Sequence, residues 1–463
     1  MTTAGIILAA GKGTRMKSSL PKILHKVAGV ALVGHVVRIM RIAGIEDITV
    51  VISSDLADSA ELSEALLPRV RILVQARQIG TADALQVARL DLAGADTIVV
   101  APADVILVTD ETVREMLEQH ISSNSLATVL GARVDDPAGL GRIQLDDSGG
   151  PSGILEEHEA DEQLLLSKLI NTAWYCFDNR WIWDELDKVD AANTGEFYLP
   201  RVIAAAAAED RSGVIISNDG DAGLGINDRV QLSKVESIMR KRTNEAHMGS
   251  GVTITDPAAT YIDVDVQIGA DTTIGPGCHI GTRSVVGSSV IIGPNTQITD
   301  SRIGDNAIVD GARVLNSIVG EGASVGSNAL LRHGAELKPR SKVGNLAEIK
   351  NSVIGSGTSV SHFSYVGDAI VGENVNIGAG TITCNYDGKD KHRTVIEDDV
   401  LIGSSTMLVA PVTIGKAART GAGSVVRDDV MAGDTVAGVP AKSIKYERVI
   451  TFRVKNRDRN LKE

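Results

Sequence analysis

The stretch Tyr261–Ile298, "YIDVDVQIGADTTIGPGCHIGTRSVVGSSVIIGPNTQI", carries an aliphatic residue at every sixth position. Neither the 3.6-residue period of a helix nor the two-residue period of a strand alone produces such spacing. After slips of one residue the spacing resumes further along the chain, so that the full ladder consists of Ile262, Ile268, Ile274, Ile280, Val286, Ile292, Ile298, Val319, Val325, Leu331, Leu337, Val343, Ile349, Ile396, Ile402, Leu408 and Ile414. A hexapeptide repeat of this kind predicts a parallel β-helix that buries one aliphatic ladder.

One insertion interrupts the repeat. The segment Thr381–Thr394, "TITCNYDGKDKHRT", is polar, partly basic and contains glycine. An insertion in a solenoid projects from one face as a loop, often a binding loop. We therefore expect this segment to leave the β-helix and to contribute to a site.

The first half of the chain follows another pattern, in which short apolar runs alternate with helical patterns. One helical face carries Leu32, Val33, Val36, Val37 and Met40. The expected strands are Gly5–Ala10, Ile48–Ser53, Arg71–Gln75, Thr97–Ala101 and Ala127–Val134. This alternation predicts an α/β domain with a mostly parallel sheet of Rossmann type, whose ligands bind beyond the carboxyl ends of the strands.

A charged helix is expected between the two halves. Leu232, Val235, Ile238 and Met239 recur at helical spacing among many charged residues, as is typical of an exposed connecting helix. The sequence therefore predicts three parts: an α/β domain over 1–228, a connecting helix over 229–249 and a hexapeptide-repeat domain over 250–463.

Composition limits the partners of the chain. The formal net charge is −13, which argues against nucleic acid or an anionic membrane surface as a partner. Three widely separated cysteines, Cys176, Cys278 and Cys384, favour neither a disulfide framework nor a zinc site. The apolar run Ile6–Ala10 is too short for a signal-peptide core, and no run of about 20 apolar residues follows. We expect a cytoplasmic protein without a membrane-inserted segment.

The opening stretch Gly5–Lys17, "GIILAAGKGTRMK", predicts a strand that runs into a phosphate-binding loop. Gly11 and Gly13 let the backbone approach a phosphate, and Arg15 and Lys22 supply positive charge. The loop is not a Walker A motif, because the first glycine of that spacing is missing. The loop therefore suits a ligand that carries phosphate groups.

The combination of this loop, the Pro21-Lys22 pair and hexapeptide repeats containing "NIGAGTITCNYDG" and "LVAPVTIG" resembles one family closely. It is similar to the bifunctional N-acetylglucosamine-1-phosphate uridylyltransferase / glucosamine-1-phosphate N-acetyltransferase family, over almost the whole chain. The resemblance implies a left-handed β-helix, although parallel crossovers are usually right-handed. It also implies a homotrimer whose neighbouring subunits complete each acetyl-transfer site.

For the uridylyltransferase half, the resemblance implies UTP and Mg²⁺ as co-substrate and metal. Arg15 and Lys22 would be the catalytic cations, and Asp104 and Asn227 the metal ligands. The residues implied to bind the nucleotide and sugar are Leu8, Ala9, Ala10, Gly11, Lys22, Gln75, Gly80, Thr81, Ala103, Gly141, Glu156, Asn171 and Asn227. Among them, the backbone of Leu8 to Gly11 with Gln75, Gly80 and Thr81 would bind uracil, and Gly141, Glu156 and Asn171 would bind the sugar.

For the acetyltransferase half, the resemblance implies acetyl-CoA as co-substrate and His362 as the catalytic base. The amine of glucosamine-1-phosphate must lose a proton before it attacks a thioester, and histidine side chains ordinarily titrate near neutrality. The implied acceptor-binding residues are Arg332, Lys350, Tyr365, Asn376, Asn385, Tyr386 and Lys391. The implied acetyl-CoA-binding residues are Ala379, Ser404 and Ala422.

The chain also departs from the pattern of this family. In the first half the departures are Asp83, Pro102, Ala103, Ala173, Pro200 and Arg201. In the second half they are His333, Ser359, Val360 and Gly438, with Lys442 or Lys445 as a substitute contact for the CoA phosphate. An added methyl group at a ligand-contacting backbone overpacks a pocket, and a new carboxylate repels a triphosphate.

Three readings remain open from the sequence. The first is a two-step enzyme that makes UDP-N-acetylglucosamine. The second keeps both folds with another sugar-1-phosphate, or with an impaired uridylyltransferase half. The third is a non-catalytic trimeric scaffold, which would release no thiol from acetyl-CoA.

Overall fold

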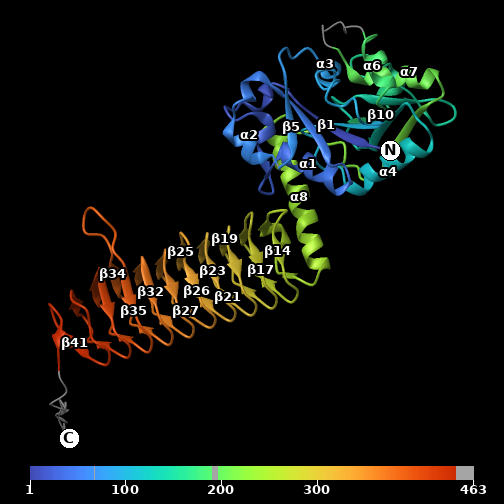
Figure 1. Ribbon diagram of the computed structural model, residues 1–463. Coiled ribbons are helices and arrows are strands. Elements are labelled where there is room, and N and C mark those ends of the chain that lie inside the picture. Colours follow the sequence, from blue (N-terminus) through green and yellow to red (C-terminus); the bar gives the residue numbers. More distant parts are fainter. Residues whose placement is uncertain (67, 190–196, 445–463) are drawn as a thin grey trace, which may run out of the picture. The chain divides into compact units, whose positions relative to one another are not determined.

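The computed structural model describes residues 1–66, 68–189 and 197–444. By its internal contacts the chain divides into two compact units, Met1–Arg240 and Lys241–Glu463, and the division falls inside helix α8 (Arg229–Gly249). Figure 1 shows an α/β unit and a β-helix of stacked rungs.

The first unit is built on one twisted sheet. Its central strands pair in the order β11-β7-β10-β6-β1-β4-β5, and β8 and β9 form an attached hairpin. The strands are β1 (Thr3–Ala9), β4 (Asp47–Ser53), β5 (Val70–Gln75), β6 (Thr97–Pro102), β7 (Ala127–Arg133), β8 (Arg142–Leu145), β9 (Pro151–Leu155), β10 (Leu169–Asp178) and β11 (Ser212–Ser217), with the small pair β2 (Lys26–Val27) and β3 (Val30–Ala31) outside the sheet.

Helices cover both faces of this sheet. Ile6 and Ile7 point to opposite faces of β1, and both are fully buried. The helices are α1 (Leu32–Ile42), α2 (Ala60–Ala65), α3 (Thr81–Gln86), α4 (Asp110–Ser122), α5 (Glu162–Leu165), α6 (Trp181–Leu186) and α7 (Val202–Ala208), with single 3₁₀ turns at Thr14–Met16, Lys22–Leu24, Ser54–Leu56 and Leu199–Arg201. The five strands expected from the sequence are confirmed within one or two residues at their ends, and the apolar face of α1 is buried.

One strand of the central path runs against the others. β10 is antiparallel to β6 and β7, whereas the pairs β1–β4, β1–β6, β4–β5 and β7–β11 are parallel. The N-terminal end of β10 therefore lies at the same edge as the carboxyl ends of β1, β5 and β6. Residues from both kinds of strand end can meet at that edge.

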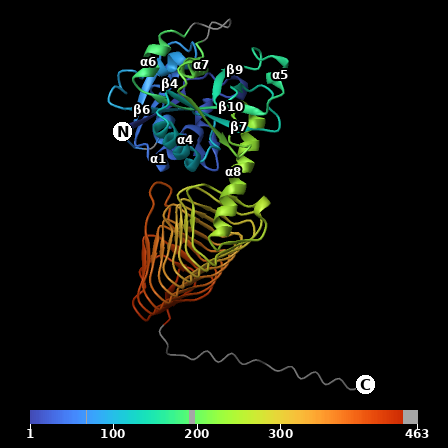
Figure 2. The ribbon, with the colours of Figure 1, turned by 90° about the vertical axis from the view of Figure 1, so that its right-hand side faces the viewer.

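The second unit is a left-handed parallel β-helix with three long sheets, and Figure 2 shows its rungs in a second orientation. The first sheet contains β12 (Thr253–Ile254), β15 (Thr273–Ile274), β18 (Ile291–Ile292), β21 (Ile308–Val309), β24 (Ser324–Val325), β27 (Lys342–Val343), β30 (Ser359–Val360), β33 (Asn376–Ile377), β36 (Leu401–Ile402), β39 (Arg419–Thr420), β41 (Thr435–Ala437) and the antiparallel β42 (Lys442–Ser443). The second contains β13 (Tyr261–Ile262), β16 (His279–Ile280), β19 (Gln297–Thr299), β22 (Arg313–Leu315), β25 (Leu330–Arg332), β28 (Glu348–Lys350), β31 (Tyr365–Gly367), β34 (Ile382–Cys384), β37 (Met407–Val409) and β40 (Val425–Val426). The third contains β14 (Gln267–Ile268), β17 (Val285–Val286), β20 (Arg302–Ile303), β23 (Ile318–Val319), β26 (Glu336–Leu337), β29 (Val353–Ile354), β32 (Ala369–Val371), β35 (Thr394–Ile396) and β38 (Val412–Ile414).

The predicted aliphatic ladder is the core of this unit. Every residue of the ladder is buried except Ile268, which is half-buried in the first rung. Each rung contributes one ladder residue from each of the three sheets, for example Ile262, Ile268 and Ile274. Helix α8 is anchored to the first rung by Asn244, whose amide donates to the carbonyls of Pro257 and Thr260 beside a 3₁₀ turn at Pro257–Ala259.

The insertion is shorter than the sequence predicted. Its first residues, Ile382–Cys384, continue the rung as β34, because Thr383 is buried and its hydroxyl bonds to Gly367 of the previous rung. Only residues 385–393 leave the β-helix before Thr394 begins β35.

In the described parts of the chain, no helix combines the length and apolar character needed to cross a membrane. The three cysteines are unpaired, with Cys176 and Cys278 buried and Cys384 half-buried.

Candidate active sites

A cavity of about 760 Å³ opens at the edge of the first sheet where β1, β5 and β6 end and β10 begins. It is lined by residues of β1 and the opening loop, by the end of β5 with the segment that leads into α3, by the end of β6 and the start of β10, by two residues just after β9, and by the segment 198–200. Of the predicted nucleotide and sugar residues, those that line it are Leu8, Ala10, Gly11, Gln75, Gly80, Thr81, Glu156 and Asn171. A smaller cavity of about 350 Å³ adjoins it and includes Ala9, Gly13 and Lys22.

The residues predicted to bind uracil lie at one end of the larger cavity. Gln75 ends β5, and its amide nitrogen donates to the carbonyl of Gly80 at 3.3 Å. Gly80 has a φ of +127°, and a Cβ there would lie 2.4 Å from the Phe197 carbonyl oxygen, so only glycine fits. Ala82 N–H donates to the same carbonyl, and the Thr81 hydroxyl accepts from Leu199 N–H. This segment is therefore held rigidly beside Gln75.

The residues predicted to bind the sugar lie together at another part of the cavity. Asn171 N–H donates to the Gly141 carbonyl at 2.9 Å, and the Glu156 carboxylate approaches Gly141. Burial raises the pKa of Glu156, and nearby Glu159 adds to this effect, while His158 opposes it. The Asn171 amide donates to the Tyr175 hydroxyl at 2.7 Å.

Lys22 joins the two residues predicted as metal ligands. Its ammonium group forms an ion pair with Asp104 and donates to the Asn227 amide oxygen at 2.8 Å. A carboxylate and an amide oxygen that converge on one point suit Mg²⁺, which takes few protein oxygens together with phosphate oxygens and water. Described residues contain no group of three or more His, Cys, Asp or Glu side chains arranged for a metal. The residues present therefore fit a shared phosphate–Mg²⁺ site and not an all-protein cage.

The opening loop brings Lys22 to this position. Gly13 has a φ of +58°, and a Cβ there would lie 2.6 Å from the Cβ of Lys22, so the loop packs against Lys22 only with glycine. Arg15 lies in the following 3₁₀ turn and is exposed. Ala103 is buried directly before Asp104, where its N–H donates to the Leu8 carbonyl.

The departure at Ala173 has a measurable cost. Ala173 lines the cavity next to Asn171 and adopts a left-handed backbone with φ of +62°, at an irregularity in the pairing of β10. That region is costly for residues that carry a Cβ, by about 1–2 kcal/mol.

We expect Ala173→Gly to stabilise the first unit by about 0.5–1 kcal/mol, because relief of this strain outweighs the extra entropy that glycine loses on folding. All three tryptophans, Trp174, Trp181 and Trp183, lie in this unit, so denaturant unfolding followed by tryptophan fluorescence reports on it alone. The matched change Ala205→Gly within α7 should destabilise by about 1 kcal/mol. Destabilisation by both changes would refute the strain at Ala173.

The other departures in this half also lie near the cavity. Pro102 and Pro200 line it, and Arg201 pairs with Glu159 at 3.2 Å. Asp83 accepts a hydrogen bond from the Gln75 amide at 2.6 Å. The departures therefore surround both the uracil end and the sugar part of the cavity.

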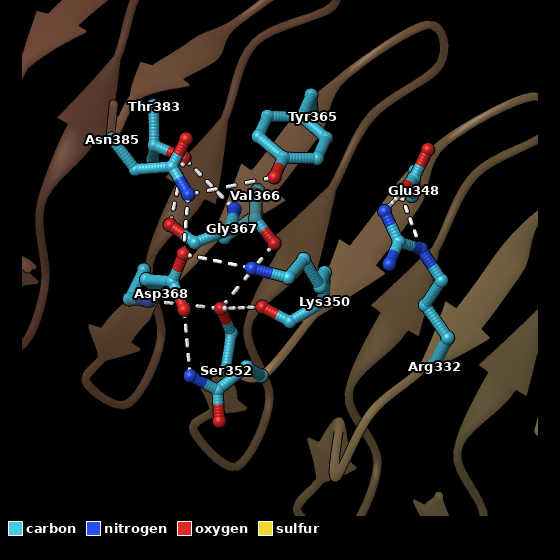
Figure 3. Close-up of polar contacts among 12 residues, drawn as sticks. Arg332, Glu348, Lys350, Ser352, Tyr365, Val366, Gly367, Asp368, Thr383 and Asn385 are labelled. Atoms are coloured by element: carbon cyan, nitrogen blue, oxygen red, sulfur yellow. Dashed lines mark hydrogen bonds and ion pairs between the residues drawn. The ribbon is translucent and has the colours of Figure 1, made fainter. Parts of the chain in front are cut away.

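A second cluster lies on the β-helix, where residues of successive rungs stack (Figure 3). Arg332 and Lys350 lie next to each other in the register of the parallel strands β25 and β28. Asp368 follows β31 on the next rung. Lys350 contacts Asp368 at 3.0 Å in a setting where both side chains are nearly buried. Asp368 also accepts from the amides of Asn351 and Asn385, and Arg332 pairs with Glu348 at 2.7 Å.

The charges in this cluster influence one another. Burial would raise the pKa of Asp368, but hydrogen bonds from Asn351, Lys350 and Asn385 lower it below the ordinary value. Lys391 reaches the cluster from the inserted loop, where Tyr386 and Lys391 form a bridge. Lys350 lowers the pKa of Lys391, and Arg332 adds to the effect. Lys391 therefore adds a third cation near Lys350 and Arg332, which are already paired with Asp368 and Glu348. An anion such as a phosphate would offset this additional positive charge.

The predicted acetyl-CoA residues occupy one corner of the β-helix together with His362. The His362 carbonyl accepts from Gly380 N–H, which directly follows Ala379. The Ala379 carbonyl accepts from Ser405 N–H, and the Ser404 carbonyl accepts from Gly423 N–H, which directly follows Ala422. A column of small residues therefore begins at the exposed His362 and runs along successive rungs.

His362 also lies close along the chain to the acceptor cluster, because three residues later Tyr365 begins β31. The Tyr365 hydroxyl accepts from the Asn385 amide at 3.5 Å. Asn376 is exposed on β33 in another sheet, paired with Ser359, and no contact joins it to this cluster within the described residues. Of the substitute CoA contacts, Lys442 lies on the last strand, β42, and Lys445 lies outside the described residues.

Several residues near the sites were not predicted. Asp368, Glu348 and Asn351 surround the acceptor cluster, and Tyr175 and Tyr198 line the N-terminal cavity. A rung of about 18 residues could have identified Asp368, because it follows Lys350 by 18 residues and precedes Asn385 by 17. No comparable spacing points to the tyrosines.

Comparison with known proteins gives the same two-part division. A MobA-like NTP transferase domain matches residues 5–171, a GMPPB C-terminal domain matches 262–335, and the hexapeptide repeat of succinyl-transferase matches 393–427. Relatives named "Bifunctional protein GlmU" are 43% identical in Syntrophomonas wolfei and 44% identical in Heliobacterium modesticaldum. These alignments cover 93% and 92% of this chain, and 96% and 93% of the respective relatives.

Proposed function

Because the chain belongs to the GlmU family of bifunctional proteins, we propose that it makes UDP-N-acetylglucosamine in two steps. The β-helix transfers an acetyl group from acetyl-CoA to glucosamine-1-phosphate. The α/β unit then transfers a uridylyl group from UTP to N-acetylglucosamine-1-phosphate and releases pyrophosphate. The observation that carries the proposal is the convergence of three cations, Arg332 and Lys350 on adjacent rungs and Lys391 on the inserted loop, beside the rung that begins with Tyr365, three residues after His362.

In the acetyl-transfer step, the three cations hold the phosphate of the acceptor. Tyr365, Asn385 and Tyr386 supply hydrogen bonds to the sugar and its phosphate, whereas Asn376, on another sheet, has no assigned part in this step. His362 takes a proton from the amine, whose lone pair attacks the thioester carbonyl; the C–S bond then breaks and the CoA thiolate leaves, taking up the proton to become the free thiol. The small residues Ala379, Ser404 and Ala422 give room along the corner for the pantetheine arm. A homotrimer, in which neighbouring subunits complete each site, is part of this proposal.

In the uridylyl-transfer step, the sugar phosphate attacks the α-phosphorus of UTP and pyrophosphate leaves. Arg15 and Lys22 neutralise the charge that accumulates on the phosphates, while Gln75, Gly80 and Thr81 hold the base. Asp104 and Asn227 are the proposed ligands of Mg²⁺, which when bound shares phosphate oxygens and neutralises their charge. Gly141, Glu156 and Asn171 hold the sugar. We place the enzyme in the cytoplasm, in keeping with its unpaired thiols.

The proposal is tested by thiol release from acetyl-CoA in the presence of glucosamine-1-phosphate, followed by addition of UTP and Mg²⁺. We expect free CoA to appear first and UDP-N-acetylglucosamine to appear after UTP is added. Glucose-1-phosphate, which has no amine, should release no thiol. Absence of thiol release with every amino sugar phosphate would favour the scaffold reading over the enzyme.

Asp368 should be needed for binding of the acetyl acceptor. In Asp368→Asn one of the two carboxylate oxygens becomes an amide nitrogen, which donates and cannot accept. If the nitrogen takes the place of Oδ1, the hydrogen bond from Asn351 is lost; if it takes the place of Oδ2, those from Lys350 and Asn385 are lost. We expect the KM for glucosamine-1-phosphate to rise about tenfold, corresponding to about 1.4 kcal/mol, while the KM for acetyl-CoA stays unchanged.

The matched control is Asp310→Asn at another corner of the β-helix, where the carboxylate accepts from the Ser327 hydroxyl. It should leave both KM values unchanged. An equal rise of both KM values in Asp368→Asn would mean that the substitution disturbs the β-helix generally.

A further inference from the structure

We propose that Asp83 determines which pyrimidine nucleotide the first active site accepts, by fixing the orientation of the Gln75 amide. This inference rests on the proposed uridylyl transfer. It assigns a specificity role to a residue that departs from the family pattern and that does not itself line the cavity. Asp83 would act through Gln75 and is therefore a positioning residue.

Gln75 is almost entirely enclosed but still reaches the cavity. Its residue exposure is only 3%, and it lines the cavity beside Gly80 and Thr81. Its amide nitrogen donates two hydrogen bonds, to Asp83 Oδ2 at 2.6 Å and to the Gly80 carbonyl at 3.3 Å. The shorter bond is to the carboxylate, and hydrogen bonds to charged groups are the stronger kind.

Both partners of this nitrogen can only accept. An ionised carboxylate and a backbone carbonyl have no proton to donate. If the amide turned by 180°, its oxygen would face two acceptors and the buried side chain would lose both hydrogen bonds. The arrangement therefore keeps Nε2 towards Asp83 and leaves Oε1 as the group that a bound base meets.

This orientation distinguishes uracil from cytosine. Uracil carries a hydrogen-bond donor at N3, whereas cytosine carries an acceptor at the same position. A fixed amide oxygen pairs with the first and repels the second. A site built around one such hydrogen bond rejects a ligand that cannot make it more strongly than an apolar pocket can.

The neighbouring segment keeps this geometry in place. Asp83 lies in the first turn of α3, a helix that begins directly after Gly80. The start of α3 is tied to the distant segment 197–199 by two hydrogen bonds. Ala82 N–H donates to the Phe197 carbonyl, and Leu199 N–H donates to the Thr81 hydroxyl. Asp83 thus cannot move away without disturbing the segment that contacts the base.

The test is a competition between equimolar UTP and CTP, with N-acetylglucosamine-1-phosphate and Mg²⁺, in which the two sugar nucleotides are separated and quantified. Their ratio equals the ratio of the two kcat/KM values, so it does not depend on how much of a variant is folded. We expect the parent to form UDP-sugar almost exclusively. Asp83→Ala should lower the ratio of UDP-sugar to CDP-sugar at least about tenfold.

Two further variants sharpen the test. Asp83→Asn keeps an acceptor but can also present a donor, so its ratio should lie between those of the parent and Asp83→Ala. Asp91→Ala removes an exposed carboxylate beyond α3 and should keep the parental ratio. A carboxylate in the first turn also stabilises a helix, but loss of that effect would leave the product ratio unchanged.

The outcomes separate this inference from the function on which it rests. A parent that forms UDP-sugar, combined with an unchanged ratio in Asp83→Ala, would overturn the role of Asp83 alone. A parent that forms neither sugar nucleotide would overturn the proposed uridylyl transfer and this inference with it.

Discussion

Replacement of His362 by alanine should lower acetyl transfer about 10²–10⁴-fold, the usual contribution of a positioned general base. The amine of the acceptor is protonated in water and cannot attack the thioester until a base removes that proton. His362 lies at the start of the corner formed by Ala379, Ser404 and Ala422, and three residues before Tyr365 of the acceptor cluster. We propose that the acyl donor and the amine meet at this histidine.

The measurement is thiol release from acetyl-CoA at saturating glucosamine-1-phosphate, together with pyrophosphate release as an internal reference. His362→Ala should leave pyrophosphate release unchanged, because the α/β unit performs that step. His279→Ala, at the exposed position of β16 beside the ladder residue Ile280, should affect neither reaction. If His362→Ala turned over acetyl-CoA as fast as the parent, another group would have to be the base.

Asp104→Asn should produce the opposite pattern, with pyrophosphate release reduced about a hundredfold or more and acetyl transfer preserved. The substitution keeps the shape of the side chain and removes the negative charge that faces Lys22 and Asn227. Charge stabilisation of a transferring phosphoryl group by a bound metal amounts to several kcal/mol, and Asp104 is the only carboxylate of the proposed ligand pair. The loss should be larger at low Mg²⁺ concentration.

Asp110→Asn is the matched control for this change. Asp110 starts α4 a few residues later and pairs with Arg114 on the surface of the same unit. It should retain parental pyrophosphate release at all Mg²⁺ concentrations. A parental rate in Asp104→Asn, or an equal loss in both variants, would contradict a metal role for Asp104.

The sequence predicted the β-helix well because its fold depends on a short-range repeat. Each rung buries one aliphatic residue per sheet. The six-residue spacing of Ile262, Ile268 and Ile274 in the sequence therefore corresponds directly to successive strands of one rung. The N-terminal strands with continuous apolar runs were also predicted. The reversed direction of β10 was not, because local pattern carries no information on which neighbour a strand joins.

The site residues likewise divide into those that a local sequence pattern identifies and those that only the folded chain brings together. The loop from Gly11 to Lys22 can be identified from its local composition of glycines and basic residues. Its contact with Asp104 is expected because β1 and β6 end at the same edge of the sheet. Asp368 lacks a local signal, although the rung period places it between Lys350 and Asn385. The contact between Asp83 and Gln75 depends on how the segment after β5 folds back, which no periodicity in the sequence describes.

The two proposed active sites lie on one chain, and the residues Pro102, Ala173 and Pro200, which depart from the family pattern, line the N-terminal cavity. The most direct test is pyrophosphate release by the purified chain with UTP, Mg²⁺ and N-acetylglucosamine-1-phosphate, with glucose-1-phosphate as a parallel acceptor. We expect robust release with the acetylated sugar and little with glucose-1-phosphate. Release only with glucose-1-phosphate, or with neither acceptor, would contradict the proposed uridylyl transfer and leave the acetyltransferase as the only proposed activity.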